Sequence, residues 1–140
     1  MKEILFRGKS VDTGKWINGF YVQKLNPCSE DGEPRIHFIM DVPPFGVAVY
    51  PETVGQYTGL TDKNCKKIFE GDIVRHYNVT TNVDSKWIFD FGTVFWDNEY
   101  QGYRRTTHEV SSEGTVKTYT LSASCIYEVI GNIHDNPELL

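Results

Sequence analysis

The sequence predicts an all-β fold, a small barrel-like domain built from short strands. Aromatic residues make up 14% of the 140 residues, and flat rings pack well on a pleated sheet. Twelve glycines and six prolines divide the chain into short segments. No stretch of helix length carries apolar residues at the 3.6-residue period of an amphipathic helix. At most one or two short helical turns are therefore expected.

The N-terminal part predicts a hairpin followed by two further strands. Residues 4–7 form the first strand, Asp12-Thr13-Gly14 a turn, and residues from Trp16 onward the return strand. Residues 26–35 contain two prolines and a glycine and predict a loop. The next strand follows from alternation, which places Ile36, Phe38 and Met40 on one face. A second alternating run covers residues 45–50.

The stretch 53–74 organises the rest of the chain. Before it, Pro51-Glu52-Thr53 predicts a single helical turn, because proline is well placed at the first helical position. The stretch itself predicts two short strands joined by a turn at Asp62-Lys63-Asn64. A tight turn at Glu70-Gly71-Asp72 then leads into a strand over residues 72–77.

The C-terminal half predicts four more strands. Residues 78–86 are polar and predict a loop, and the aromatic run 87–96 predicts a strand in which Gly92 marks a bulge or sharp bend. Strands are also expected over 99–110 and 115–121, separated by a turn at 111–114. Residues 126–133 are apolar on both faces, which predicts a central strand.

The order of these elements resembles an SH3-like barrel. A strand opened by Gly-Asp is followed by a long loop and then by the Gly-x-Val strand at residues 92–94. We find no internal repeat and no low-complexity segment. The chain therefore predicts a single domain over residues 1–140, a normal size for one domain.

Charge disfavours nucleic acid as a partner. The net charge is −5 and the pI is near 5.3, whereas nucleic-acid affinity depends on neutralising phosphates. The alternative stays open in one place, where the loops 78–86 and 99–109 could bring basic and aromatic side chains together. The candidate binding residues there are Trp87, Tyr100, Tyr103, Arg104 and Arg105, with Lys86 nearby.

No catalytic, metal-binding or cofactor-binding residues are predicted. The four histidines are scattered and lack the spacing of metal ligands. Glu70 and Asp72 could pair as an acid and a base, but Gly71 between them favours a turn. The three cysteines, Cys28, Cys65 and Cys125, are odd in number and widely spaced, which indicates free thiols in a reducing cytosol. A small hydrolase is therefore the weakest of the functional alternatives.

The N-terminus predicts neither secretion nor membrane insertion. Its apolar run ends at Arg7 and is far too short for a signal peptide. No run approaches the roughly 20 apolar residues of a membrane-spanning helix. We expect a cytoplasmic protein.

Two long blocks closely resemble the YopX family of phage and prophage proteins. The first comprises residues 51–60, 62–64 and 69–74, read as PETVGQYTGL, DKN and FEGDIV; the second comprises residues 127–133 and 136–140, read as YEVIGNI and NPELL. Arg7-Gly8 and Gly14-Lys15-Trp16 with Gly19 are similar to the family's N-terminal hairpin. The resemblance implies a mostly-β protein of a phage or prophage in a bacterial cytosol, with no activity to carry over. Cys65 departs from the pattern, because the family usually has glycine there.

The function expected from these observations is an interaction module. It would bind a host or phage protein, or its own copies in a homo-oligomer, because aromatic residues and short edge strands leave apolar surface to share. A nucleic-acid-binding barrel is the alternative.

Overall fold

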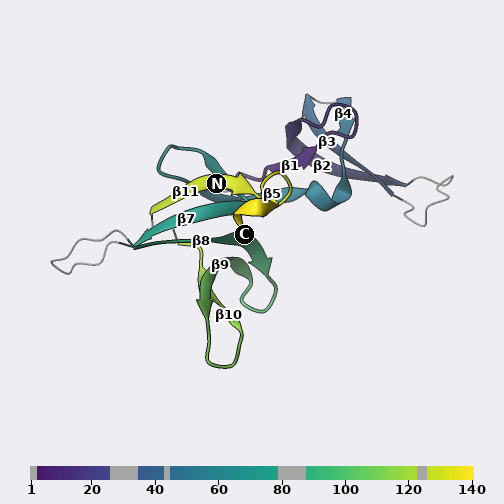
Figure 1. Ribbon diagram of the computed structural model, residues 1–140. Helices are drawn as coiled ribbons and strands as arrows, with labels where there is room; N and C mark the ends of the chain where they lie inside the picture. Colours follow the sequence, from purple (N-terminus) through teal and green to yellow (C-terminus); the bar gives the residue numbers. More distant parts are fainter. Residues whose placement is uncertain (1–2, 26–34, 43–44, 79–87, 123–125) are drawn as a thin grey trace. The chain divides into compact units, whose positions relative to one another are not determined.

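The computed structural model describes residues 3–25, 35–42, 45–78, 88–122 and 126–140 (Figure 1). Within these ranges the chain forms eleven strands and two single-turn 3-10 helices, so the predicted all-β class is confirmed. The chain divides into two compact units, Met1–Tyr57 and Thr58–Leu140, called here the N-terminal and C-terminal units. All strand pairs described below are antiparallel.

The N-terminal unit begins with the predicted hairpin. In it, Phe6 lies opposite Gly19 and Lys9 opposite Trp16, and Gly14 adopts a positive φ of 70° in the turn. The predicted helical turn at 51–53 is also present. The strands of this unit pair in the order β4-β3-β2-β1-β5. Their bounds are β1 Phe6–Lys9, β2 Trp16–Leu25, β3 Arg35–Val42 and β4 Phe45–Ala48, followed by η1 Pro51–Thr53 and β5 Gly55–Thr61, which runs on into the C-terminal unit.

One side of this sheet forms a small core. Ile39 and Val49 are buried, and a Cβ on Gly8 would lie only 3.0 Å from the Val49 side chain. A bridge between Ser10 and Val49 joins the end of β1 to the chain just after β4. The sheet of this unit therefore curls back toward its own first strand.

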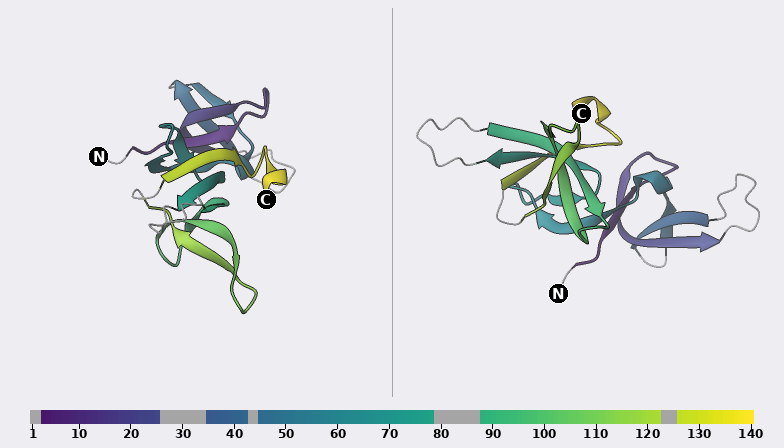
Figure 2. Two further views of the ribbon diagram at one scale, coloured as in Figure 1. Left: turned by 60° about the vertical axis from the view of Figure 1, so that its left-hand side comes forward. Right: turned by 90° about the horizontal axis from the view of Figure 1, so that it is seen from below.

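The C-terminal unit contains a five-stranded sheet in the order β10-β9-β8-β7-β11 (Figures 1 and 2). Its core consists of five buried residues, four on different strands and one just after β10, with three partly buried neighbours: Ile68, Val74, Val94, Tyr127 and Leu121, then Leu60, Tyr103 and Val129. The elements are β6 Lys67–Phe69, β7 Asp72–Asn78, β8 Ile88–Asp97, β9 Gly102–Val110, β10 Val116–Thr120, β11 Ile126–Asn132 and η2 Pro137–Leu139.

Gly92 lies next to the point where the pairing of β8 with β7 ends and its pairing with β9 begins. Residues 88–93 of β8 pair with β7 and residues 94–97 pair with β9. The pairing of β7 with β8 runs through Gly92 without a shift, so the predicted bulge is absent from it. A Cβ on Gly92 would overlap the carbonyl oxygen of Thr106. Glycine is therefore needed here for the close approach of β9.

Two topological predictions were wrong. The five-stranded sheet is open, ending at β10 and β11, and does not close into a barrel. The segment 126–133, predicted to be central, forms the edge strand β11. Its outer edge is covered by a turn: Asp62 accepts the Val129 N–H and the Lys63 N–H donates to the Tyr127 carbonyl. The turn thus satisfies two of the outward-facing backbone groups of this edge strand.

Candidate functional site

Four of the five residues predicted to bind a ligand belong to the β8–β9 hairpin, in its turn or on β9. Trp87 lies outside the described residues, as does Lys86. Tyr100 is exposed in the turn, whereas Tyr103, Arg104 and Arg105 follow on β9. Successive side chains of a strand point to opposite faces, so Arg104 and Arg105 diverge and do not form a single basic surface.

The Arg104 guanidinium donates its hydrogen bonds to the neighbouring strand β10. Its guanidinium donates to the Thr118 carbonyl at 2.9 Å, to Thr118 Oγ1 and to Thr120 Oγ1. Asp97 lies 3.8 Å from its Nε, and the Tyr100 ring lies 4.3 Å from its central carbon. Only 13% of this side chain is exposed. Arg104 therefore has little surface left for a ligand.

Through these contacts the Arg104 side chain reaches the outer edge of β10, which is an edge strand of the sheet. The Leu121 N–H donates to the Tyr103 carbonyl, and donors alternate along an antiparallel pair. Thr120 and Thr118 therefore direct their backbone groups away from β9, toward the outer edge of β10. By binding the Thr118 carbonyl, Arg104 covers one of these edge groups.

Arg105 is buried on the opposite face. Its Nη2 lies 2.9 Å from Nδ1 of His76, and its central carbon lies 5.3 Å from the Tyr119 ring centroid. His76 in turn packs against the ring of Tyr127, a core residue. Because Arg105 carries only donors, the bonded nitrogen of His76 is an acceptor. Arg105 thus joins β9 to β7 inside the C-terminal unit.

Tyr103 is also part of the packing. Its ring meets Trp96 edge-on, with the centroids 5.0 Å apart, and lies against the core. Burial, together with the negative charge of Glu70, raises the pKa of Tyr103 to about 12. The hydroxyl therefore stays protonated at neutral pH and cannot act as a general base.

A different surface, on the N-terminal unit, is apolar and exposed. Three cross-strand pairs of β2 and β3 form it, Phe20 with Met40, Val22 with Phe38, and Lys24 with Ile36, and we call these six residues the Phe20 face. Phe20 is 61% exposed and Val22 38% exposed, although both are apolar. The side of the sheet that carries Ile39 is the buried one.

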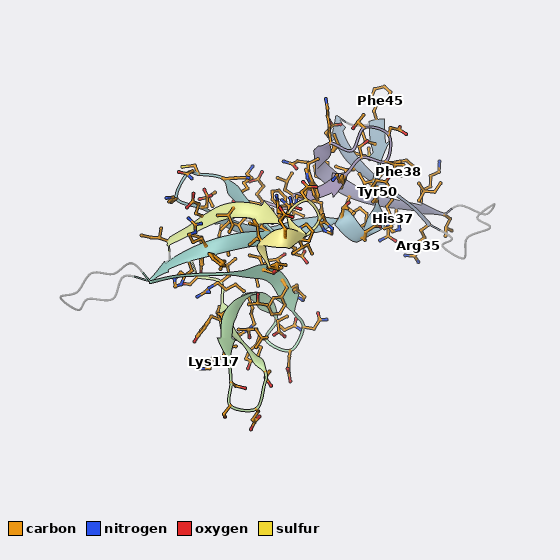
Figure 3. All side chains as sticks on the ribbon, in the orientation of Figure 1. Arg35, His37, Phe38, Phe45, Tyr50 and Lys117 are labelled. Carbon is orange, nitrogen blue, oxygen red and sulfur yellow. The ribbon has the colours of Figure 1, made fainter. Side chains whose placement is uncertain are left out.

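The far ends of β2 and β3 form a two-stranded arm. Residues 24–25 of β2 and 35–36 of β3 pair with each other beyond the positions where the pairings of β1 and β4 end, as Figure 2 shows. Figure 3 shows Arg35 and His37 toward one end of β3, and Phe45 projecting at the far end of the unit. On the arm's other face, the Tyr21 hydroxyl bonds Nδ1 of His37 and Arg35 donates to Gln23. Sequence alternation placed Ile36, Phe38 and Met40 on one face but could not show whether that face is exposed.

The comparison with family models covers almost the whole chain. A model described as "YopX protein" matches residues 5–140, which includes both units. The chain belongs to the YopX family. The resemblance predicted from the two sequence blocks is thus confirmed.

Among solved structures, this YopX-family protein is similar to one described as "Crystal structure of protein EF1440 from Enterococcus faecalis". The two chains are 22% identical, with a TM-score of 0.47, over 100% of this chain and 99% of that one. No curated protein matches.

The first YopX-like block folds into a turn held by a buried carboxylate. Asp62 Oδ1 accepts the N–H groups of Asn64 and Lys66 at 2.8 and 2.9 Å, and Oδ2 accepts that of Val129 at 3.0 Å. Burial alone would raise the pKa of Asp62, but these three donors and the Lys66 charge outweigh it and hold the pKa below its usual value. Asp62 therefore remains ionised and structural.

The second turn of this block is also held by a buried carboxylate that accepts a backbone N–H. The Phe69 N–H donates to Asp72 Oδ2 at 2.8 Å, and Gly71 between them has a φ of 86°. The prediction that Glu70-Gly71-Asp72 is a turn is confirmed. A buried carboxylate bonded to backbone is placed for folding, not for acid–base chemistry.

Groups suited to metal binding are missing from the part of the chain that the structure describes. No three side chains of His, Cys, Asp or Glu gather there in a way that could hold a metal ion. No helix among the described residues is long and apolar enough to span a membrane. Among the described residues, Phe20 and Val22 are exposed apolar side chains that share one face of the β2–β3 pair.

Proposed function

We propose that this YopX-family protein is an interaction module that binds another protein through the Phe20 face. The observation that supports it is the exposure of Phe20 and Val22 on one face of the β2–β3 pair. Contiguous apolar surface of this kind marks interaction sites on soluble proteins. Burying a phenylalanine side chain of this exposure against a partner would contribute about 1.5–3 kcal/mol.

The sheet edges favour a side-chain face over strand addition as the mode of binding. In the described residues, Arg104 covers part of the β10 edge and the turn at Asp62 covers the β11 edge. At β4, the Val11 N–H donates to the Ala48 carbonyl. The edge strands β4, β10 and β11 thus each have an outward-facing backbone group already bonded, which limits their pairing with a foreign strand.

Family membership supports a proposal for where the protein is encoded and where it acts. We infer that the protein is encoded by a bacteriophage or prophage and acts in the bacterial cytosol, as the YopX resemblance implies. Self-association into a homo-oligomer stays a prediction. Sedimentation at two protein concentrations tests it, and a monomer mass at both would contradict it.

The experiment that tests the interaction module compares three immobilised proteins in nuclease-treated bacterial lysate. The wild type and Leu25→Ser should retain the same bacterial proteins, whereas Phe20→Ser should lose them. Leu25 is a matched control, because it is 71% exposed on the same strand but on the opposite face. Identical retention by all three proteins would refute binding through the Phe20 face.

A further inference from the structure

We propose that the outer edge of β10 is a pairing site for β10 of a second copy of this chain, and that Arg104 controls access to it. This inference is independent of the Phe20 face. β10 is the last strand of its sheet, and Val116 and Tyr119 on it are 48% and 43% exposed. In Figures 1 and 2 the β9–β10 hairpin projects from the rest of this sheet. An exposed edge strand of this kind can pair with a strand of another chain.

Thr118 and Thr120 present the backbone groups for such pairing. The bond from the Leu121 N–H to the Tyr103 carbonyl fixes the alternation of donors along β9 and β10. Both threonines therefore direct their N–H and C=O groups away from β9. Arg104 bonds the Thr118 carbonyl, whereas the two N–H groups and the Thr120 carbonyl have no hydrogen-bond partner in the part of the chain that the structure describes. These three groups are available to a second strand.

The sequence of β10 is complementary to itself when two copies run antiparallel about a twofold axis at Thr118. Thr118 then lies opposite its own copy, and the two residues exchange two N–H···O=C bonds. Val116 lies opposite Thr120 and Lys117 opposite Tyr119, so all five residues of the strand overlap. Threonine pairs of this kind stabilise antiparallel sheets, whereas an axis at Lys117 would set two lysines against each other. The register centred on Thr118 therefore fits a second copy of this chain.

Arg104 lies across the edge that the second strand would join. Its Nη2 donates to the Thr118 carbonyl at 2.9 Å and its Nη1 to Thr120 Oγ1 at 3.1 Å. Asp97 and the ring of Tyr100 hold the guanidinium from the other side. When two copies of β10 pair, the Thr118 carbonyl must exchange this charged donor for a backbone N–H. Arg104 therefore keeps the wild-type dimer weak, and its removal should strengthen it.

The first experiment measures the dimer by sedimentation equilibrium of the full chain over a series of concentrations. Arg104→Ala should lower the dimer dissociation constant at least about ten-fold, because a hydrogen bond from a charged donor is worth about that factor. Thr118→Pro, added to Arg104→Ala, should restore the monomer. Proline removes only the N–H that points away from β9, so the β9–β10 bonds stay in place. Circular dichroism checks that both variants are folded.

The second experiment tests the register by oxidative cross-linking of Thr118→Cys and Thr120→Cys. At the twofold axis the two Cα atoms of residue 118 would lie about 5.5 Å apart, within the range of a disulfide. Residue 120 would lie four residues from its own copy, about 13 Å along the strand. At high protein concentration Thr118→Cys should form a covalent dimer, and Thr120→Cys should form no more than the wild type, whose Cys65 is exposed. Both variants keep Arg104, so this test holds if Arg104→Ala fails to fold.

Four results would overturn the inference. An unchanged dissociation constant in folded Arg104→Ala would show that Arg104 does not control the edge. A dimer that survives Thr118→Pro would place the contact elsewhere, and on the Phe20 face if Phe20→Ser dissociates it. Species that grow beyond a dimer would show an open series of contacts instead of a closed twofold pair. Equal cross-linking of Thr118→Cys and Thr120→Cys would exclude the register centred on Thr118.

Discussion

The Asp62 carboxylate accepts the backbone N–H of Val129 at 3.0 Å, although 67 residues separate the two in the chain. The other carboxylate oxygen accepts the N–H groups of Asn64 and Lys66 within its own turn. One buried side chain thus shapes the turn after β5 and fastens it to the edge of β11. This pair links the two sequence blocks that resemble the YopX family.

Replacing Asp62 should destabilise the C-terminal unit. In Asp62→Asn the amide nitrogen brings donors toward backbone donors, so at least one buried N–H loses its acceptor. Hydrogen bonds to a charged group contribute about 1.5–3 kcal/mol each, so we expect a loss of about 2–3 kcal/mol in the free energy of unfolding. Urea denaturation measures it, and faster amide exchange at Val129 locates it. Asp12→Asn, in an exposed turn, is the control and should change neither quantity.

The stability contributed by Asp62 should also depend on pH. Its folded pKa lies below the ordinary value of 3.8, so the contribution is complete above pH 3.8 and disappears as the pH falls through the folded pKa. The difference between wild type and Asp62→Asn should therefore narrow at acidic pH. A difference that is constant between neutral and strongly acidic pH would show that the carboxylate charge plays no part.

Cys65 is strained in the same turn. Its φ is 63°, in the left-handed region that favours glycine, which fits the glycine that the YopX resemblance leads one to expect at this position. A side chain costs on the order of 1 kcal/mol in this conformation. Cys65→Gly should therefore raise the melting temperature, while Cys65→Ser, which keeps the Cβ, should leave it nearly unchanged. A clear drop for the glycine variant would mean that the exposed Cys65 side chain stabilises the turn.

Local sequence chemistry predicted the turns well. Pro51, Gly71 and the Asp62-Lys63-Asn64 cluster each specify a backbone conformation through their own side chains or lack of one, so no distant residue is needed. The β11 edge strand could not be predicted in this way. Its backbone edge is bonded by the turn at Asp62 and Lys63, a long-range contact that alternation within residues 126–133 cannot reveal.

In the candidate site, too, some features could be predicted from the sequence and others could not. Adjacent residues alternate in a strand, so the separation of Arg104 from Arg105 could have been predicted once β9 was assigned. That Arg104 binds the Thr118 carbonyl depends on the β9–β10 register, which the sequence does not specify by itself. The Phe20 face was visible as a pattern, but its exposure follows from the sheet curling toward Ile39 instead.

Gly92 provides a test of the close packing of β8 and β9. In Gly92→Ala the new methyl group would overlap the Thr106 carbonyl, a backbone atom that cannot rotate away. We expect a loss of about 3 kcal/mol or more, at the upper end of overpacking effects. Gly102→Ala is the matched control, because its nearest neighbour would be the Tyr100 carbonyl at 4.0 Å. Thermal denaturation followed by circular dichroism compares them, and equal melting temperatures would contradict the described approach of β9.

Arg104 should protect the edge of β10 and should not bind nucleic acid. Arg104→Ala removes the donor to the Thr118 carbonyl and the stacking partner of Tyr100, so about 2 kcal/mol of stability should be lost. The uncovered strand should then pair with other copies, which sedimentation at rising concentration would detect as larger species. Glu113→Ala, in the exposed β9–β10 turn, is the control and should match the wild type in stability and in sedimentation.

The nucleic-acid alternative is tested with the same residue. Because Arg104 is already held by Thr118 and Asp97, and Arg105 by His76, neither guanidinium is placed to take phosphate. Single- and double-stranded oligonucleotides should therefore bind no more tightly than about micromolar at physiological salt. Fluorescence anisotropy measures this. Tighter, salt-resistant binding that the Arg104→Ala, Arg105→Ala double variant abolishes, while circular dichroism shows it still folded, would assign these arginines to a nucleic-acid site.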